Sequence, residues 1–258
     1  MLRRSMSWSA LGGAACAIIL CASSPAIASA PVLRYTLPTT TETYYYQFSA
    51  TLSNTLLVGQ GVQTSPRSYS AVVTERIVPV SADLAQVTLT FNEGPKGVGD
   101  PMHGTRTVNG VAATFELTPL GVRDYQATPA TNPAQSDIGE IFEHFVAFAP
   151  ALPGKALTTW GTQPRIDLGG GPLTLTMENV YLGATGGSPE IIESGAGEDP
   201  FLHNNAAISQ TFCFLPGFRA LESADIVETA TADASSLADG SDVEGAQITL
   251  TIQRIAHP

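Results

Sequence analysis

The chain has 258 residues and a formal net charge of −11 at pH 7, from 12 basic and 23 acidic residues. Nucleic acid and anionic lipid surfaces are bound by basic patches, so this acidic charge argues against both as partners. The length is enough to bury a sizeable hydrophobic core.

The first 28 residues have the organisation of a secretory signal peptide. Arg3 and Arg4 precede an apolar stretch at 10–22, and small residues follow in SSPAIASAP. This order of charged, apolar and small residues is typical of export, and we expect cleavage after Ala28. The apolar stretch is shorter than the about 20 residues of a spanning helix, so we expect no transmembrane segment in the mature chain.

Removal of this leader changes the charge and the cysteine content. It leaves ten of the 12 basic residues and all 23 acidic ones, a net charge of about −13. Cys213 becomes the sole cysteine, so no intramolecular disulfide can form. A lipoprotein signal at Cys21 is the competing interpretation, but Leu20 is not the small residue that should precede a lipidated cysteine. We therefore expect an exported protein, periplasmic or secreted, without lipid at Cys21.

Alternation of apolar and polar residues predicts strands along most of the mature chain. In residues 43–54, Tyr44, Tyr46, Phe48 and Ala50 fall on one side and polar residues on the other. Similar segments are 67–80, 84–91, 111–119, 122–128, 172–184, 206–216, 224–234 and 245–255. Such alternation indicates an antiparallel sheet with one face in water.

One segment between these two groups of strands has a helical period instead. Ser136 or Asp137 can cap its start, and Pro150 follows its end. Apolar residues recur at spacings of three and four, namely Ile138, Ile141, Phe142, Phe145 and Phe148. This pattern predicts one amphipathic helix of about 12 residues.

Two acidic clusters could bind calcium, or could be solvated loops. The first lies at 239–244 and the second at 190–199, and both contain glycine. Their acidic and hydroxyl residues are Asp239, Ser241, Asp242 and Glu244, and Glu190, Glu193, Glu198 and Asp199. The spacing of the first does not fit the EF-hand loop, and for both clusters we favour solvated loops.

No pattern predicts catalysis or a metal site. Glu140 and His144 lie four residues apart in the predicted helix, opposite its apolar side, where an exposed ion pair is favoured over a general base. His103 and His203 lie in separate loops without spaced ligands. Cys213, between two phenylalanines, is expected to pack rather than react. We therefore expect a protein that is not an enzyme and needs no cofactor or metal.

Three consecutive stretches carry a resemblance to a known group of proteins. They are TFELTPLGVRDY, the helical EIFEHFVAFAP, and ALPGKALTTWGT, which leads back into strands. In this order the chain resembles the half-barrel proteins of bacterial envelopes, such as periplasmic lipoprotein carriers and related exported proteins. The resemblance implies a long curved sheet around a covering helix, and lipid transport as its use.

We accordingly predict one mainly β domain over residues 29–258, a curved antiparallel sheet or half-barrel with one covering amphipathic helix. We expect Phe142, Phe145, Phe148 and Trp160 to line a groove for an apolar small molecule or lipid. The alternative is that these side chains close a filled core in a structural or surface-interaction protein. An enzyme of unrecognised type is the least favoured hypothesis.

Overall fold

The computed structural model describes nine parts of the chain. They are residues 31–58, 61–93, 98–100, 104–106, 112–127, 149–167, 172–198, 204–232 and 243–256. Within these residues there is no helix. The signal peptide, the predicted helix at 136–148 and the acidic cluster at 239–242 lie outside them, so those predictions stay predictions.

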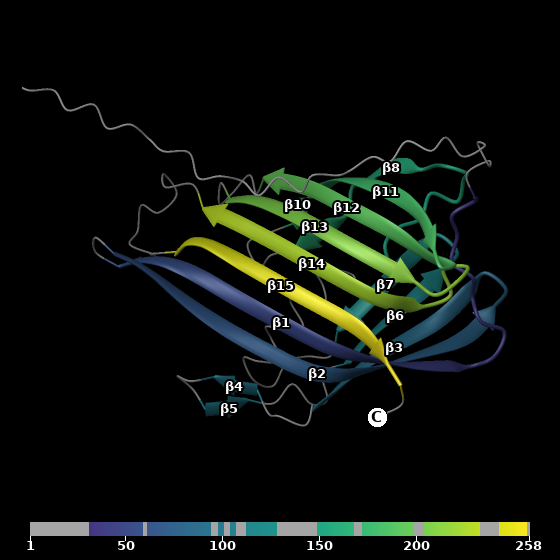
Figure 1. The fold of residues 1–258 in the computed structure, drawn as a ribbon, viewed down its shortest axis with the longest axis horizontal. Coiled ribbons are helices and arrows are strands. Elements are labelled where there is room, and N and C mark those ends of the chain that lie inside the picture. Colours follow the sequence, from purple (N-terminus) through teal and green to yellow (C-terminus); the bar gives the residue numbers. More distant parts are fainter. Residues whose placement is uncertain are drawn as a thin grey trace, which may run out of the picture.

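Eleven strands form one antiparallel sheet in the order β7-β6-β3-β2-β1-β15-β14-β13-β12-β11-β8 (Figure 1). In chain order they are β1 (Glu42–Val58), β2 (Gly61–Ser81), β3 (Leu84–Glu93), β6 (Ala112–Thr118), β7 (Gly121–Ala127), β8 (Thr159–Thr162), β11 (Thr176–Thr185), β12 (Ser188–Glu198), β13 (Asn204–Phe214), β14 (Leu221–Ala232) and β15 (Val243–Ile255). Two small hairpins accompany the sheet, β4 (Val98–Asp100) with β5 (Gly104–Arg106), and β9 (Arg165–Asp167) with β10 (Pro172–Thr174).

The first and last strands lie side by side in the middle of the sheet. β1 pairs with β15 from Tyr45 opposite Ile255 to Leu56 opposite Val243. The five strands before residue 128 therefore form one half, and the six strands after residue 158 form the other. The predicted all-antiparallel sheet is confirmed, and its two groups of strands match the two groups predicted around the helical segment.

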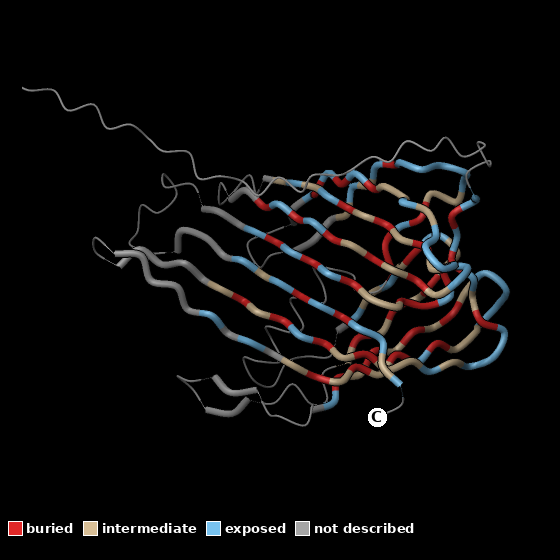
Figure 2. The backbone as a smooth tube through the Cα atoms, viewed as in Figure 1, coloured by how far each residue is buried: buried red, intermediate tan, exposed pale blue. Residues whose placement is uncertain are grey.

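Alternation along the strands creates a buried inner face. Phe48 on β1 lies opposite Ala71 on β2 and Ile252 on β15, and all three are buried. Figure 2 shows buried residues alternating with less buried ones along the central strands. Directly opposite residues share one face of a sheet, so these rows form a continuous core.

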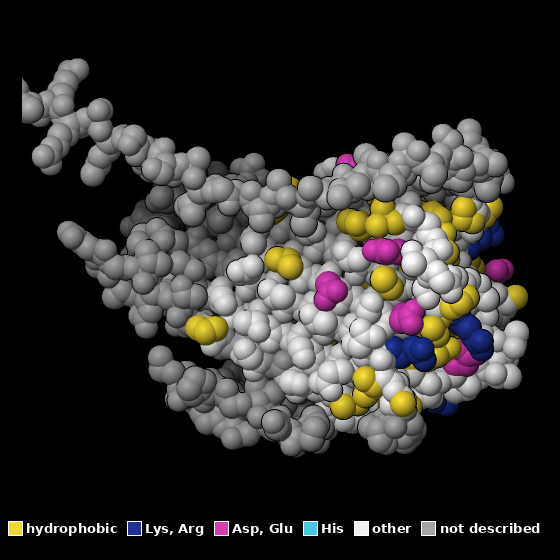
Figure 3. Space-filling model, viewed as in Figure 1, with side chains coloured by type: hydrophobic (Ala, Val, Ile, Leu, Met, Phe, Trp, Pro, Cys, Tyr) yellow, Lys and Arg dark blue, Asp and Glu magenta, His cyan; other side chains and the backbone are white. Residues whose placement is uncertain are grey.

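The outer face of the sheet is mainly uncharged and polar. Ser49 and Thr51 on β1, and Thr249 and Thr251 on β15, alternate with the core residues. In Figure 3, single apolar and acidic side chains lie among uncharged ones over the middle of this face, and apolar side chains gather along its upper edge and at the right-hand end. The described Lys and Arg side chains in that view gather toward one end.

The sheet is curved and unclosed, with β7 and β8 as its edges. Residues 149–155, which we name the seam segment, bond to residues at both edges. The amide of Leu152 donates to the carbonyl of Leu120, beside β7, at 2.8 Å. The indole Nε1 of Trp160, on β8, donates to the carbonyl of Ala151 at 2.9 Å. The curved-sheet prediction is confirmed, and a non-helical segment joins its edges.

The N-terminal residues of the described chain pack against the same segment. The amide of Tyr35 donates to the carbonyl of Pro119 at 2.9 Å, and its hydroxyl donates to the carbonyl of Pro150 at 2.6 Å. Its ring meets Phe214 and Phe218 edge-on, at centroid distances of 5.9 and 6.4 Å. These contacts hold the seam segment against the core.

One predicted loop is a strand. Residues 188–198, expected to be a solvated acidic loop, form β12 and pair with β11 and β13. Pairing on both sides overrides the low strand preference of its glycine and acidic residues. As a consequence Glu193 lies on the buried inner face rather than in water.

Candidate ligand cavity

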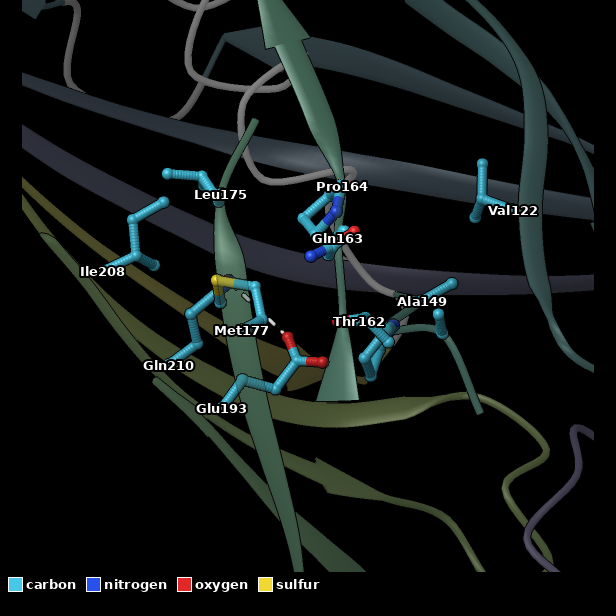
Figure 4. A pocket seen from close by; sticks show the side chains of 12 residues that line it. Val122, Ala149, Thr162, Gln163, Pro164, Leu175, Met177, Glu193, Ile208 and Gln210 are labelled. Atoms are coloured by element: carbon cyan, nitrogen blue, oxygen red, sulfur yellow. Dashed lines mark hydrogen bonds between the residues drawn. The ribbon is translucent and has the colours of Figure 1, made fainter. Parts of the chain in front are cut away.

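A cavity of about 320 Å³ lies between the inner face of the sheet and the seam segment (Figure 4). Twelve residues line it: Val122, Ala149, Pro150, Ala151, Thr162, Gln163, Pro164, Leu175, Met177, Glu193, Ile208 and Gln210. Eight of them are apolar. A mostly apolar hollow of this size, with a few polar groups, is typical of a small-molecule site.

The two edges of the sheet both reach this cavity. Val122 on β7 lies opposite the buried Leu117, and Thr162 on β8 lies opposite the buried Met177. Both therefore face inward, and the seam segment lies between them. The cavity is formed where the two edges approach without pairing.

The floor of the cavity depends on a glycine in β12. Gly195 lies opposite Met177 on β11 and opposite Ile208 on β13. A Cβ at Gly195 would lie 2.5 Å from the carbonyl oxygen of Thr176 and 2.2 Å from the sulfur of Met177. Only glycine therefore lets the Met177 side chain lie over β12 and reach the cavity.

Three polar side chains cross the inner face in one row, which we name the polar row. Asn179 on β11 lies opposite Glu193 on β12, and Glu193 lies opposite Gln210 on β13. All three are buried, and Glu193 and Gln210 line the cavity. The amide of Asn179 donates to the carbonyl oxygen of Trp160 at 3.1 Å and to the hydroxyl of Thr162 at 3.2 Å.

Hydrogen bonds within the polar row are incomplete. Gln210 Nε2 donates to Glu193 Oε2 over 3.5 Å, which is long for a hydrogen bond. The amide oxygens of Gln210 and Asn179 are buried without a hydrogen-bond partner. Buried polar atoms are nearly always paired in native proteins, so these two oxygens each need a hydrogen-bond donor.

Burial raises the pKa of Glu193 to about 8. Its carboxyl is therefore mostly protonated at neutral pH and can donate a hydrogen bond as well as accept one. Among the described residues, those that line the cavity include no Lys, Arg or His. The site thus presents neutral hydrogen-bonding groups in an apolar hollow.

A second buried carboxyl lies on the same inner face, outside the cavity. Glu75 on β2 is 5% exposed and accepts a hydrogen bond from the Tyr46 hydroxyl at 2.7 Å. Burial raises its pKa to about 7, although the Tyr46 bond opposes this shift. Glu193 and Glu75 also raise the pKa of Tyr35, after burial itself, so Tyr35 lies within electrostatic range of both.

The predicted ligand-binding residues are placed only in part. Phe142, Phe145 and Phe148 lie outside the described residues. Trp160 lies on the edge strand β8, is 9% exposed, and binds the carbonyl of Ala151 through its indole nitrogen. It lies beside the cavity rather than among its lining residues, so a contact between Trp160 and a ligand stays a prediction.

The polar row was missed at the level of sequence, although the sequence contains a signal for it. Glu193 follows Ile191 by two residues, Gln210 follows Ile208, and both continue an apolar alternation. Glu75 likewise stands between Val73 and Ile77. A polar residue at an inward position of an alternating strand predicts a buried polar group.

The remaining candidate residues are placed only in part. In the described parts of the chain, no group of three His, Cys, Asp or Glu residues is arranged to hold a metal ion. His103, His144 and His203 lie outside those parts. Cys213 lies half-buried in β13, and burial raises the pKa of its thiol, which disfavours the reactive thiolate.

Comparisons with known proteins show a fold likeness and no family. No protein-family model and no curated protein sequence matches this chain. A solved structure that describes lipid–protein interactions in lipovitellin matches 85% of this chain with a TM-score of 0.51 and 12% identity. The chain corresponds to 25% of the length of that protein. At this identity the likeness shows a shared fold alone.

A second solved structure is a domain from Vibrio parahaemolyticus assigned to outer membrane lipoprotein sorting. It matches 84% of this chain over 86% of its own length, with 8% identity. Its TM-score of 0.24 is too low to indicate a shared fold.

Proposed function

We propose that this protein binds an apolar ligand of lipid type in the cavity between its curved sheet and seam segment, without catalysing a reaction. The observation that carries the proposal is the apolar cavity of about 320 Å³ itself. This volume lies at the lower end of the roughly 300–1,000 Å³ that ligand pockets span. A protein whose core is simply filled would leave no such space.

The fold and the chemistry of the walls support binding rather than catalysis. A curved sheet of this kind also occurs in lipovitellin, whose structure describes lipid–protein interactions. An apolar ligand in contact with lining side chains such as Ile208, Leu175 and Val122 would remove apolar surface from water, which stabilises the complex. Among the lining residues that the structure describes, the Thr162 hydroxyl makes no hydrogen bond to the Glu193 carboxyl, so no nucleophile is paired there with a base.

We further propose that the protein acts in the bacterial envelope or outside the cell. The support is the charged, apolar and small-residue order of residues 1–28. The described strands and loops include no helix with the length and hydrophobicity needed to cross a bilayer. Export is tested by N-terminal sequencing of the protein from periplasm and medium. We expect a start at Ser29, and an intact Met1 in the cytoplasm would contradict the proposal.

Ligand binding is tested with diphenylhexatriene, a hydrocarbon whose fluorescence rises in apolar surroundings. The protein, purified without detergent and extracted with organic solvent, should enhance this fluorescence with saturation at one site. Val122→Phe fills the cavity from β7 and should weaken the probe's binding about tenfold or more, because the probe and the new ring compete for the same space.

The matched control is Val227→Phe, the same change at an exposed valine on β14, which is 37% exposed. It should leave probe binding unchanged. Equal loss in both variants, or no saturable binding by the unmodified protein, would overturn the proposal in favour of a structural or surface-interaction protein.

A further inference from the structure

The polar atoms in the cavity wall are more informative than its apolar surface. Glu193 and Gln210 are each 6% exposed, and both line the cavity. A purely apolar ligand would leave the oxygen of Gln210 buried and unpaired in the complex. Burying such an atom without a partner costs free energy, so the site favours a ligand that supplies one.

The side chains of Glu193 and Gln210 can both donate and accept hydrogen bonds. Gln210 Nε2 is used by Glu193, over 3.5 Å, while Gln210 Oε1 has no donor. If the amide were turned over, its oxygen would face Glu193 and its nitrogen would lack an acceptor instead. In either orientation one atom of the Gln210 amide stays unpaired, and the neutral carboxyl of Glu193 can form further hydrogen bonds.

Charge limits what this position can accept. The lining residues that the structure describes include no cationic side chain to balance an anionic head group. A cationic head group would need Glu193 to ionise, which its burial in this apolar wall opposes. An uncharged group that donates and accepts, such as a hydroxyl or an undissociated carboxyl, avoids both costs.

We propose that the ligand is an amphiphile with an apolar body and an uncharged donor–acceptor head group, held between Glu193 and Gln210. This inference rests on the proposed function, because it specifies the class of ligand for the same cavity. It differs from simple hydrocarbon binding by requiring a hydroxyl-type head group at one wall.

The experiment compares four compounds with the same alkyl chain as competitors of diphenylhexatriene. They are 1-decanol, decyl methyl ether, decylamine and decyl sulfate. At pH 7 we expect decanol to compete about tenfold more strongly than the ether, which lacks the donor, as one buried hydrogen bond can provide. The amine and the sulfate, both charged, should be weaker than decanol.

Variants test whether the polar row causes the preference for decanol over the ether. In Gln210→Leu the ratio of decanol to ether affinity should fall close to one. The matched control is Glu75→Gln, which alters a buried carboxyl outside the cavity and should keep the wild-type ratio. If Gln210→Leu does not fold, as judged by circular dichroism, Glu193→Gln in its place should retain the preference, because a neutral amide also donates and accepts.

The outcomes separate this inference from the function on which it rests. If the probe binds and decanol and ether compete equally, or if the amine or sulfate is preferred, the head-group inference is wrong and the cavity remains an apolar site. If the probe does not bind at all, the proposed function itself fails. Loss of the preference in Glu75→Gln as well would also overturn the assignment to Glu193 and Gln210.

Discussion

At the scale of single residues, the buried carboxyls make the stability of this protein depend on pH. Glu193 has a pKa of about 8 and Glu75 of about 7 in the folded state, against an ordinary value of 4.5. Unfolding therefore releases protons between about pH 4.5 and 8. These groups contribute most to the free energy of unfolding below about pH 4.5. Their contribution is lost as the pH rises through 7 and 8.

We predict that Glu193→Gln is less sensitive to this rise in pH than the unmodified protein. A tenfold difference in proton affinity corresponds to about 1.4 kcal/mol. Between pH 5 and 8 the unmodified protein should therefore lose a few kcal/mol more unfolding free energy than Glu193→Gln. Urea unfolding at several pH values measures it. Parallel curves for the two proteins would show that the Glu193 carboxyl is not protonated by burial.

Gly195 is the second residue whose identity is fixed by its surroundings. Gly195→Ala should destabilise the protein by about 1–3 kcal/mol, because the new methyl group meets a backbone oxygen that cannot move aside. The control is Gly186→Ala, where no atom lies within 4 Å of the added Cβ and the positive φ of 63° alone opposes the change. A smaller loss at Gly195 than at Gly186, measured by thermal unfolding, would contradict the close approach of β11 and β12.

At the scale of elements, the seam segment is the least regular part of the cavity wall. Its place is fixed by side-chain hydrogen bonds from Tyr35, which lies 115 residues before Pro150, and from Trp160, which lies nine residues after Ala151. Sequence patterns predict none of these bonds, because neither residue belongs to the same local period as residues 149–155. The segment was predicted only as the chain beyond the end of a helix.

We predict that Tyr35→Phe lowers the free energy of unfolding by about 1–2 kcal/mol. It removes the hydroxyl that donates to the carbonyl of Pro150 and leaves that buried oxygen unpaired. Leu157→Ala, at a 40% exposed position two residues past the seam segment, should change stability by less than about 0.5 kcal/mol. Equal effects in the two variants, measured by urea unfolding, would mean that the Tyr35 bond does not hold the seam segment.

Strands were the elements that sequence predicted best, and β12 shows why the prediction can fail. The alternation predicted in residues 43–54 falls within β1, and its buried face is the predicted one from Tyr46 to Leu52. β12 contains two glycines and three acidic residues, which are poor strand formers, and was predicted as a loop. Its pairing with two neighbours supplies the stabilisation that local preference lacks.

At the scale of the whole molecule, β1 and β15 join two halves into one sheet. Phe48 lies at this junction, 0% exposed, with its ring edge-on to Phe91 at 5.3 Å. We predict that Phe48→Ala lowers the free energy of unfolding by about 3–5 kcal/mol, as for other large-to-small changes in cores.

The same variant also tests whether the halves unfold together. Trp160 lies on β8 at the far edge of the other half and is the sole tryptophan after residue 28. Its fluorescence and far-ultraviolet circular dichroism should change at the same urea concentration, shifted equally by Phe48→Ala. A shift in circular dichroism without a shift in Trp160 fluorescence would show that the halves unfold separately.

The sequence by itself determined the acidic charge, the prediction of a leader, the presence of a single cysteine after residue 28, and most of the strands. These features follow from composition and from alternation with a period of two, and both can be recognised from residues that are close together in the sequence. The tertiary structure decided that β1 pairs with β15, that the edges β7 and β8 meet at the seam segment, and that Glu193 and Gln210 face a cavity. Burial depends on residues brought together from distant parts of the chain, so a glutamate in an alternating strand becomes a buried neutral acid only when the sheet curves around it.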